Sequence, residues 1–130
     1  MFTLHYIIPL IIFYFYRNKI MLWGLLLANL IDLDHIYYRL IGQVGWFESA
    51  CPHLGMQCSL GYYPLHTFIV FIISILITGI SFFILKLDVF KISKKQKRSK
   101  FYIKLIFWIS VGIIIHFCLD YLHLLMGFGI

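Results

Sequence analysis

Four long apolar stretches dominate this chain, at residues 2–16, 20–38, 64–87 and 101–126. A helix needs about 20 apolar residues to cross the hydrocarbon core of a bilayer, and all but the first stretch approach or exceed that length. Hydrophobic residues make up 62% of the chain and charged residues 12%, whereas soluble domains average about 45–50% and about 25%. This composition excludes a soluble enzyme. It predicts an all-α polytopic membrane protein: a single domain over residues 1–130, folded as an antiparallel four-helix transmembrane bundle.

The connections between these stretches predict how the chain crosses the membrane. Residues 39–63 form a glycine-containing loop, and residues 88–100 form a connection rich in Lys and Arg. If residues 17–19 and 88–100 share one side of the membrane, every Lys and Arg except Arg39 lies on that side. Positive residues concentrate on the cytoplasmic side. We therefore expect a multi-pass protein of the bacterial inner membrane, with both termini and the loop 39–63 extracytoplasmic and residues 88–100 cytoplasmic.

That topology also predicts the partners of the chain. The net charge of +6 arises beside apolar runs, where basic residues contact anionic headgroups. Membrane lipids are therefore the expected partners, and nucleic acid is not.

Ionisable side chains gather at the outer end of every predicted helix. Spacings of four and three residues place His116, Asp120 and His123 on one helical face, and a spacing of three places Asp32 and His35 on another. Ionisable groups inside a membrane are costly and mark functional sites by default. Their convergence at one depth predicts such a site, built from His5, Asp32, Asp34, His35, His66, His116, Asp120 and His123.

Imidazole nitrogens and carboxylate oxygens are the ligands of zinc, iron and manganese sites. We therefore expect a divalent metal ion, with zinc first and iron or manganese as the other choices. The expected ligands are His35, His66, His116 and Asp120. Asp32 is expected to be a further ligand or a bridge to a second ion. Ion pairing among the same residues without a metal is the alternative.

Four further residues have supporting roles in this interpretation. His5 and His123 would orient the ligands or transfer protons from outside the coordination sphere. Asn29 would form an interhelical hydrogen bond. The hydroxyl of Thr67 would either contact a ligand or cap the helix that follows it.

Three segments carry a resemblance to a known family: residues 29–35 (NLIDLDH), 58–67 (CSLGYYPLHT) and 116–120 (HFCLD). They resemble a bacterial family of small four-helix membrane proteins, a domain of unknown function. That family is similar in turn to the larger LexA-binding, inner membrane-associated metal-dependent hydrolases. The shared pattern is Asp-x-Asp-His at one helix end, His-Ser or His-Thr at the next helix start, and a late His-x-x-x-Asp. The resemblance covers most of the chain in order, and it implies a divalent metal and hydrolysis. The larger relatives usually carry an Arg near the second motif, where this chain has Tyr62-Tyr63-Pro64.

Metal-dependent hydrolysis at the outer membrane surface is the function that these features favour. A divalent metal makes water acidic enough to attack an ester at neutral pH, and Asp32 or Asp34 would act as the catalytic general base. A lipid phosphoester is the favoured substrate. One alternative is a proton or metal-ion transport protein, which predicts polar groups along the inner helix halves, although residues 68–80 are almost entirely apolar. The other is a non-catalytic membrane module with a structural His/Asp cluster.

Overall fold

The computed structural model describes residues 2–41, 65, 67–87 and 94–125, and within these ranges the chain is helical and contains no strand. The elements are α1 (Phe2–Tyr16), α2 (Lys19–Ala28), the 3₁₀ helix η1 (Asn29–Asp32), α3 (Leu33–Leu40), α5 (Phe68–Lys86) and α6 (Lys94–Leu125). The all-α prediction is therefore confirmed.

Two of these helices are long and apolar enough to cross a membrane. They are Phe68–Lys86, with a mean hydropathy of 2.9, and Arg98–Leu122, with a mean hydropathy of 2.0. Helix α1 is also apolar but has 15 residues, so it rises only about 22 Å against a hydrocarbon core of about 30 Å. Residues 19–40 are divided into α2, η1 and α3. Two spans are thus supported by length and composition, and four spans remain a prediction.

The first helical hairpin begins and ends close to the predicted positions. Helix α1 ends at Tyr16, and Arg17 has a positive φ of 48° that reverses the chain direction. The side-chain oxygen of Asn18 then accepts hydrogen bonds from the backbone N–H groups of Ile20 (3.0 Å) and Met21 (3.3 Å). This is a standard N-cap, which satisfies donors that have no partner within the helix.

The second hairpin differs from the prediction at two helix starts. Helix α5 begins at Phe68, after the capping residue Thr67, and not at residue 64. Helix α6 begins at Lys94, so the basic residues 94–100, expected in a connection, are helical. Lys, Arg and Gln are good helix formers, and they extend α6 beyond its apolar part.

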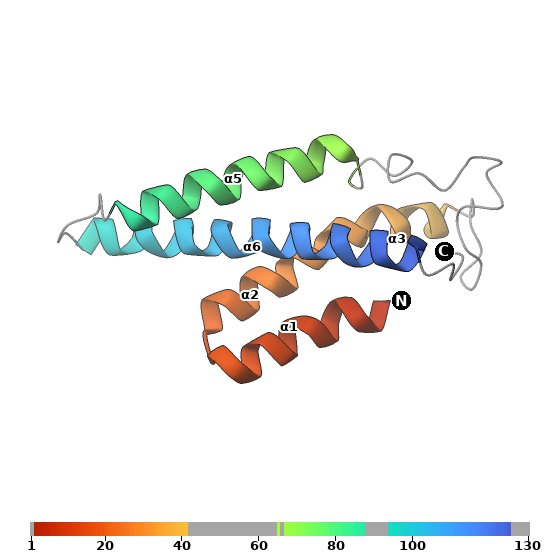
Figure 1. Cartoon of the computed structure of the whole chain (residues 1–130), viewed down its shortest axis with the longest axis horizontal. Coiled ribbons are helices and arrows are strands. Elements are labelled where there is room, and N and C mark those ends of the chain that lie inside the picture. Colours follow the sequence, from red (N-terminus) through yellow and green to blue (C-terminus); the bar gives the residue numbers. More distant parts are fainter. Residues whose placement is uncertain (1, 42–64, 66, 88–93, 126–130) are drawn as a thin grey trace.

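The helices pack in the order α5, α6, α2, α1. In Figure 1, α6 runs between α5 on one side and α2 on the other, and α1 lies against α2. Helices α1 and α5 run in one direction and α2 and α6 in the other (Figure 1). The start of α1, the end of η1 and the end of α6 therefore approach the same end of the molecule.

Small residues bring α2 and α6 into close contact. Gly24 and Ala28 are one helical turn apart and face α6. A Cβ at Gly24 would clash with Trp108, and a Cβ at Gly112 would lie 2.5 Å from the Cβ of Ala28. Small residues four apart allow this kind of close backbone approach between membrane helices. Because Gly112 stands one turn before His116, the contact brings His116 close to the end of α2.

Helix α5 packs on α6 through aromatic side chains and small hydroxyl residues. The Phe71 and Phe117 rings lie 5.5 Å apart between centroids, and Ser74 and Ser110 are buried. The hydroxyl of Ser74 donates a hydrogen bond to the carbonyl of Val70 at 2.8 Å, so its polar group is satisfied within its own helix.

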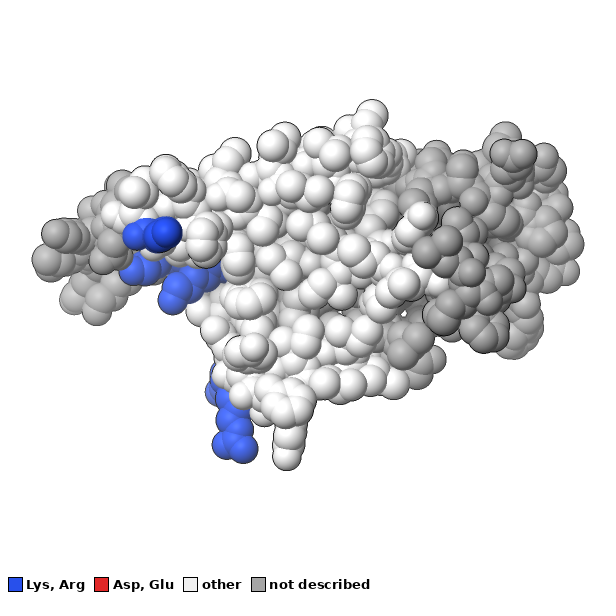
Figure 2. All heavy atoms as spheres, viewed as in Figure 1, with Lys and Arg blue, Asp and Glu red and all other residues white. Residues whose placement is uncertain are grey.

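The basic side chains that the structure describes lie at the end of the molecule opposite the ends of η1 and α6. Figure 2 shows them on the left, where α1 meets α2 and where α5 ends and α6 begins. Among them, Arg17 and Lys19 are exposed at the first turn, and Lys86 and Arg98 are exposed at the second. This segregation has the form that a positive-inside arrangement predicts.

Candidate metal centre

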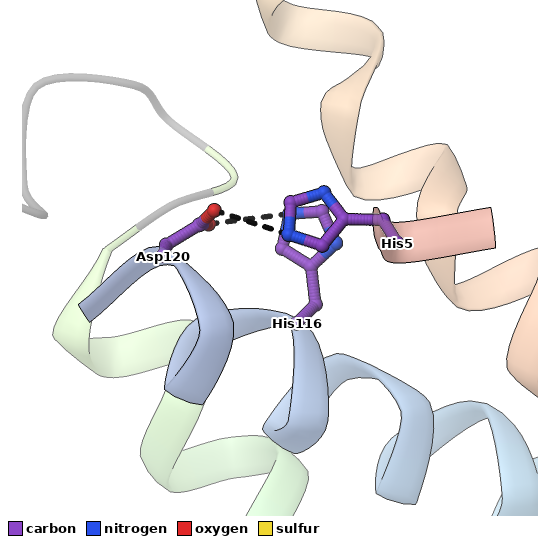
Figure 3. Close-up of side chains that lie close together, drawn as sticks. All are labelled: His5, His116 and Asp120. Atoms are coloured by element: carbon purple, nitrogen blue, oxygen red, sulfur yellow. Dashed lines mark ion pairs between the residues drawn. The ribbon is translucent and has the colours of Figure 1, made fainter. Parts of the chain in front are cut away.

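Two histidines and two aspartates from three elements meet near the end of α6. His5 lies near the start of α1, Asp32 ends η1, and His116 and Asp120 lie one turn apart on α6. Figure 3 shows the Asp120 carboxylate pointing at the His5 and His116 rings, which lie over each other. The site therefore joins the first helix of the chain to the last.

Each histidine contacts both aspartates. His116 Nε2 lies 3.2 Å from Asp32 Oδ1 and 3.3 Å from Asp120 Oδ2. His5 Nε2 lies 3.4 Å from Asp120 Oδ1, and His5 Nδ1 lies 3.9 Å from Asp32 Oδ2. The two imidazole rings are stacked, with centroids 4.0 Å apart and planes inclined by 29°. These four side chains, His5, Asp32, His116 and Asp120, are called the His/Asp cluster below.

The cluster is largely buried. The exposed fraction of the side chain is 1% for His116, 6% for His5, 8% for Asp32 and 16% for Asp120. Two buried carboxylates need positive charge beside them, because an uncompensated buried charge is very unfavourable. Either protonated imidazoles or a bound cation would supply it. Asp120 is the most exposed member of the cluster.

The donor atoms are spaced as a metal site requires. One ligand atom from each of His5, His116 and Asp120 lies within 4.8 Å of the others. Bonds of about 2.0–2.1 Å to a tetrahedral zinc ion put neighbouring ligand atoms about 3.4 Å apart. The distances from Asp120 Oδ2 to His116 Nε2 (3.3 Å) and from Asp120 Oδ1 to His5 Nε2 (3.4 Å) are each close to that value, although they involve different oxygens of the carboxylate. The cluster could therefore hold a metal ion after small side-chain adjustments.

A buried amide links α1 to η1 beside the cluster. Asn29 Nδ2 donates a hydrogen bond to the backbone carbonyl of His5 at 3.1 Å, and both residues are buried. Asn29 therefore forms the kind of interhelical hydrogen bond that was expected of it. A cavity of about 10 Å³, whose lining includes His5, Pro9, Asn29 and His116, lies next to this bond. Such a volume has room for about one water molecule.

The close contact of His5 with the cluster could not be read from the sequence, and its role inside or outside the coordination sphere stays a prediction. His5 was expected to act outside the coordination sphere, yet its imidazole contacts Asp120 as closely as a ligand would. The i, i+4 spacing of His116 and Asp120 showed that these two share a face. In α1 no ionisable residue stands three or four positions from His5. Because this helix is apolar nearly all round, its sequence does not show which face points inward.

Thr67 caps helix α5, and four predicted site residues have side chains that the structure does not describe. The Thr67 hydroxyl accepts a hydrogen bond from the backbone N–H of Val70 at 3.4 Å, which is the capping role that the sequence left open. His66 lies outside the described residues, as do the side chains of Asp34, His35 and His123. The roles expected of His35 and His66 as ligands, of Asp34 as a base and of His123 as a supporting residue therefore stay predictions.

No protein family, no curated protein and no solved structure shows a detectable similarity to this chain. Any assignment of function therefore depends on the chemistry of the His/Asp cluster and on its position in the helices.

Proposed function

We propose that this chain is an integral membrane protein whose His/Asp cluster binds a divalent metal ion, zinc first, and uses it for hydrolysis at the membrane surface. One observation carries the proposal: two histidines and a carboxylate from the first and last helices place ligand atoms within 4.8 Å of one another. Two of these residues, His116 and Asp120, belong to a segment apolar enough to span a membrane.

Charge balance favours a metal over ion pairing alone. With neutral imidazoles the two carboxylates of the cluster carry a charge of about −2, which a divalent cation cancels. Without a metal, full charge compensation would need two additional protons in the cluster, and placing both on the imidazoles would put two like charges on rings stacked 4.0 Å apart, where they repel. A cation that accepts both imidazole lone pairs removes this repulsion.

Hydrolysis follows from the roles that the chain's residues can take. His5, His116 and Asp120 would hold the ion, which supplies Lewis acidity and acidifies water. Asp32 faces the same space, with Oδ1 3.2 Å from His116 Nε2. Asp32 would accept a proton from the attacking water and return it to the leaving alkoxide, so that one ester bond breaks and one molecule of water is consumed. In this proposal Asp34 is a second candidate base.

The location of the cluster favours a lipid phosphoester as substrate. His116 and Asp120 lie near the end of α6, and the described basic residues lie at the opposite end of the molecule (Figures 1 and 2), which the positive-inside rule assigns to the cytoplasm. The cluster and both termini are then extracytoplasmic, at headgroup depth in the inner membrane. The same reaction class is what the motif resemblance of residues 29–35, 58–67 and 116–120 implies.

A structural metal site is the second candidate function. Its support is the burial of the cluster, with 1% of the His116 side chain exposed, and the small volume of the neighbouring cavity, about 10 Å³. Structural zinc sites are closed, whereas catalytic sites keep one position open for water. A metal bound with four protein ligands and no exchangeable water would favour this second function.

The decisive experiment is the metal content of detergent-purified protein beside His116→Ala and Asp120→Ala. We expect about one zinc, iron or manganese ion per chain in the wild type and a loss in both variants. Ser74→Ala is the matched control, because it removes a buried polar group from α5 away from the cluster. Metal that stays at the wild-type level in His116→Ala, or a wild type that takes up no ion on reconstitution, would refute the proposal.

Activity is then measured on phosphoesters of membrane lipids, with and without removal of the metal. Hydrolysis that disappears with the metal and returns when it is restored supports the enzyme. Stoichiometric metal without hydrolysis, combined with a lower unfolding temperature after chelation, supports the structural site.

A further inference from the structure

We infer that Pro9 is a positioning residue for the metal site. By lacking a backbone N–H, it leaves the His5 carbonyl available to Asn29, and the resulting hydrogen bond fixes the His5 imidazole against His116 and Asp120. The inference rests on the metal-binding function proposed above and adds a residue that contacts no metal.

The first step concerns the backbone of α1. In an α-helix each N–H donates to the carbonyl four residues earlier. Pro9 follows His5 by four residues within α1, and proline has no N–H to donate. The helix therefore lacks the bond that would ordinarily occupy the His5 carbonyl.

The second step concerns the partner that replaces this bond. His5 is buried, with 6% of its surface exposed, and a buried carbonyl without a partner is costly. Asn29 Nδ2 donates to this carbonyl at 3.1 Å. An ordinary residue at position 9 would supply a competing N–H, and the carbonyl would then be drawn back toward the axis of α1.

The third step connects this bond to the His5 side chain. Most described side chains of α1 are exposed, including Tyr6 (45%), Leu10 (52%) and Ile11 (51%). His5 and Pro9 are its buried residues among those with described side chains. Apolar packing therefore holds α1 weakly, and the bond from Asn29 sets where the His5 backbone lies. The imidazole that extends from this backbone reaches Asp120 Oδ1 at 3.4 Å.

A purely structural role for Pro9 makes a different prediction. If Pro9 only fills space beside the cavity, Pro9→Ala should lower stability and metal affinity together. If Pro9 acts through the missing N–H, the two quantities should separate. Alanine is the best helix former and proline the worst, so metal-free Pro9→Ala should unfold at an equal or higher temperature while its metal affinity falls.

The experiment compares full-length wild type, Pro9→Ala, Asn29→Leu and the double variant. The readouts are the zinc dissociation constant by competition, the visible spectrum of bound Co²⁺ and thermal unfolding without metal. Loss of a residue that supports a metal ligand typically weakens binding about 10–100-fold, and we expect that range for Asn29→Leu and about 10-fold for Pro9→Ala. The double variant should bind no more weakly than Asn29→Leu, because both changes remove the same hydrogen bond. Altered Co²⁺ spectra should accompany the losses.

Ile8→Ala is the matched control. It changes a side chain that lines the same cavity, and it keeps proline, which has no N–H, at position 9. Its affinity should remain near that of the wild type. If the wild type binds metal and Pro9→Ala binds it equally well, the positioning role is wrong and the metal site stands. If the losses of zinc affinity in the two single variants add up fully in the double variant, the argument that both substitutions remove the same hydrogen bond is also wrong. If the wild type binds no zinc or Co²⁺, the proposed function fails and the inference fails with it.

Discussion

The contact between Gly112 and Ala28 should control both the stability of the protein and its metal affinity. A Cβ at position 112 would lie 2.5 Å from the Cβ of Ala28 and 3.2 Å from the Cα of Leu25. Carbon atoms in contact are separated by about 3.5–4.0 Å, so Gly112→Ala must push α2 and α6 apart by about 1 Å. His116 follows one turn after Gly112 on α6, and η1 continues directly from α2.

The displacement is large relative to the cluster. Asp32 Oδ1 and His116 Nε2 are 3.2 Å apart, and an added 1 Å of separation would take this pair beyond hydrogen-bonding distance. Overpacking of this kind typically costs about 1–3 kcal/mol of folding free energy. We expect Gly112→Ala to lower the unfolding temperature in detergent and to weaken zinc binding.

A compensating substitution makes the prediction specific. Ala28→Gly removes the Cβ that Gly112→Ala meets, so the double variant should recover part of the unfolding temperature and part of the affinity. The recovery should be incomplete, because Leu25 still lies 3.2 Å from the new Cβ. Circular dichroism melts and zinc competition on the two single variants and the double variant measure this. An unchanged melt for Gly112→Ala, or no recovery in the double variant, would refute the packing argument.

Four further predictions follow from the site and its surroundings. His5→Ala should lower metal content as strongly as His116→Ala, measured by elemental analysis, because both imidazoles offer ligand atoms; retained metal in His5→Ala would show that α1 is not part of the site. Asp32→Asn should retain most of the metal and lose hydrolysis, measured as turnover per bound ion, because the amide cannot accept a proton; full turnover would exclude Asp32 as the base. Thr67→Ala should cost about 1 kcal/mol of unfolding free energy through the lost cap and leave zinc affinity unchanged, and a weakened affinity would contradict the capping role. Lys19→Cys, at the exposed turn between α1 and α2 in a chain whose native cysteines are replaced by serine, should react with an impermeant thiol reagent in inverted inner-membrane vesicles and not in intact spheroplasts; the reverse result would overturn the orientation.

The sequence was sufficient for the helical class and for part of the cluster. The turn at Arg17 and Asn18 separates two apolar runs, and α1 ends where that turn predicts. The spacing of His116 and Asp120 placed them on one face, and the structure shows both contacting the imidazole of His5. These features are local: a turn residue and a helical spacing determine them without knowledge of the neighbouring helices.

Features that depend on contacts between helices were beyond the reach of the sequence. Helix α1 is apolar on nearly every face, so periodicity does not reveal that His5 points inward. The close approach at Gly24 and Ala28 is a recognisable small-residue spacing, but the spacing does not name α6 as the partner. The basic residues 94–100 are good helix formers, but their charge is also typical of a solvated connection. In the structure they are helical.

The 3₁₀ segment Asn29–Asp32 also has a consequence for transplanting this site into another scaffold. A 3₁₀ helix rises about 2.0 Å and turns about 120° per residue, against about 1.5 Å and 100° in an α-helix. From Asn29 to Asp32 the difference amounts to about 1.5 Å along the axis and about 60° of rotation. A designer who grafted the four side chains onto regular α-helices would therefore turn Asp32 by about a sixth of a turn away from the two imidazole rings. The graft must copy the tighter winding together with the residues.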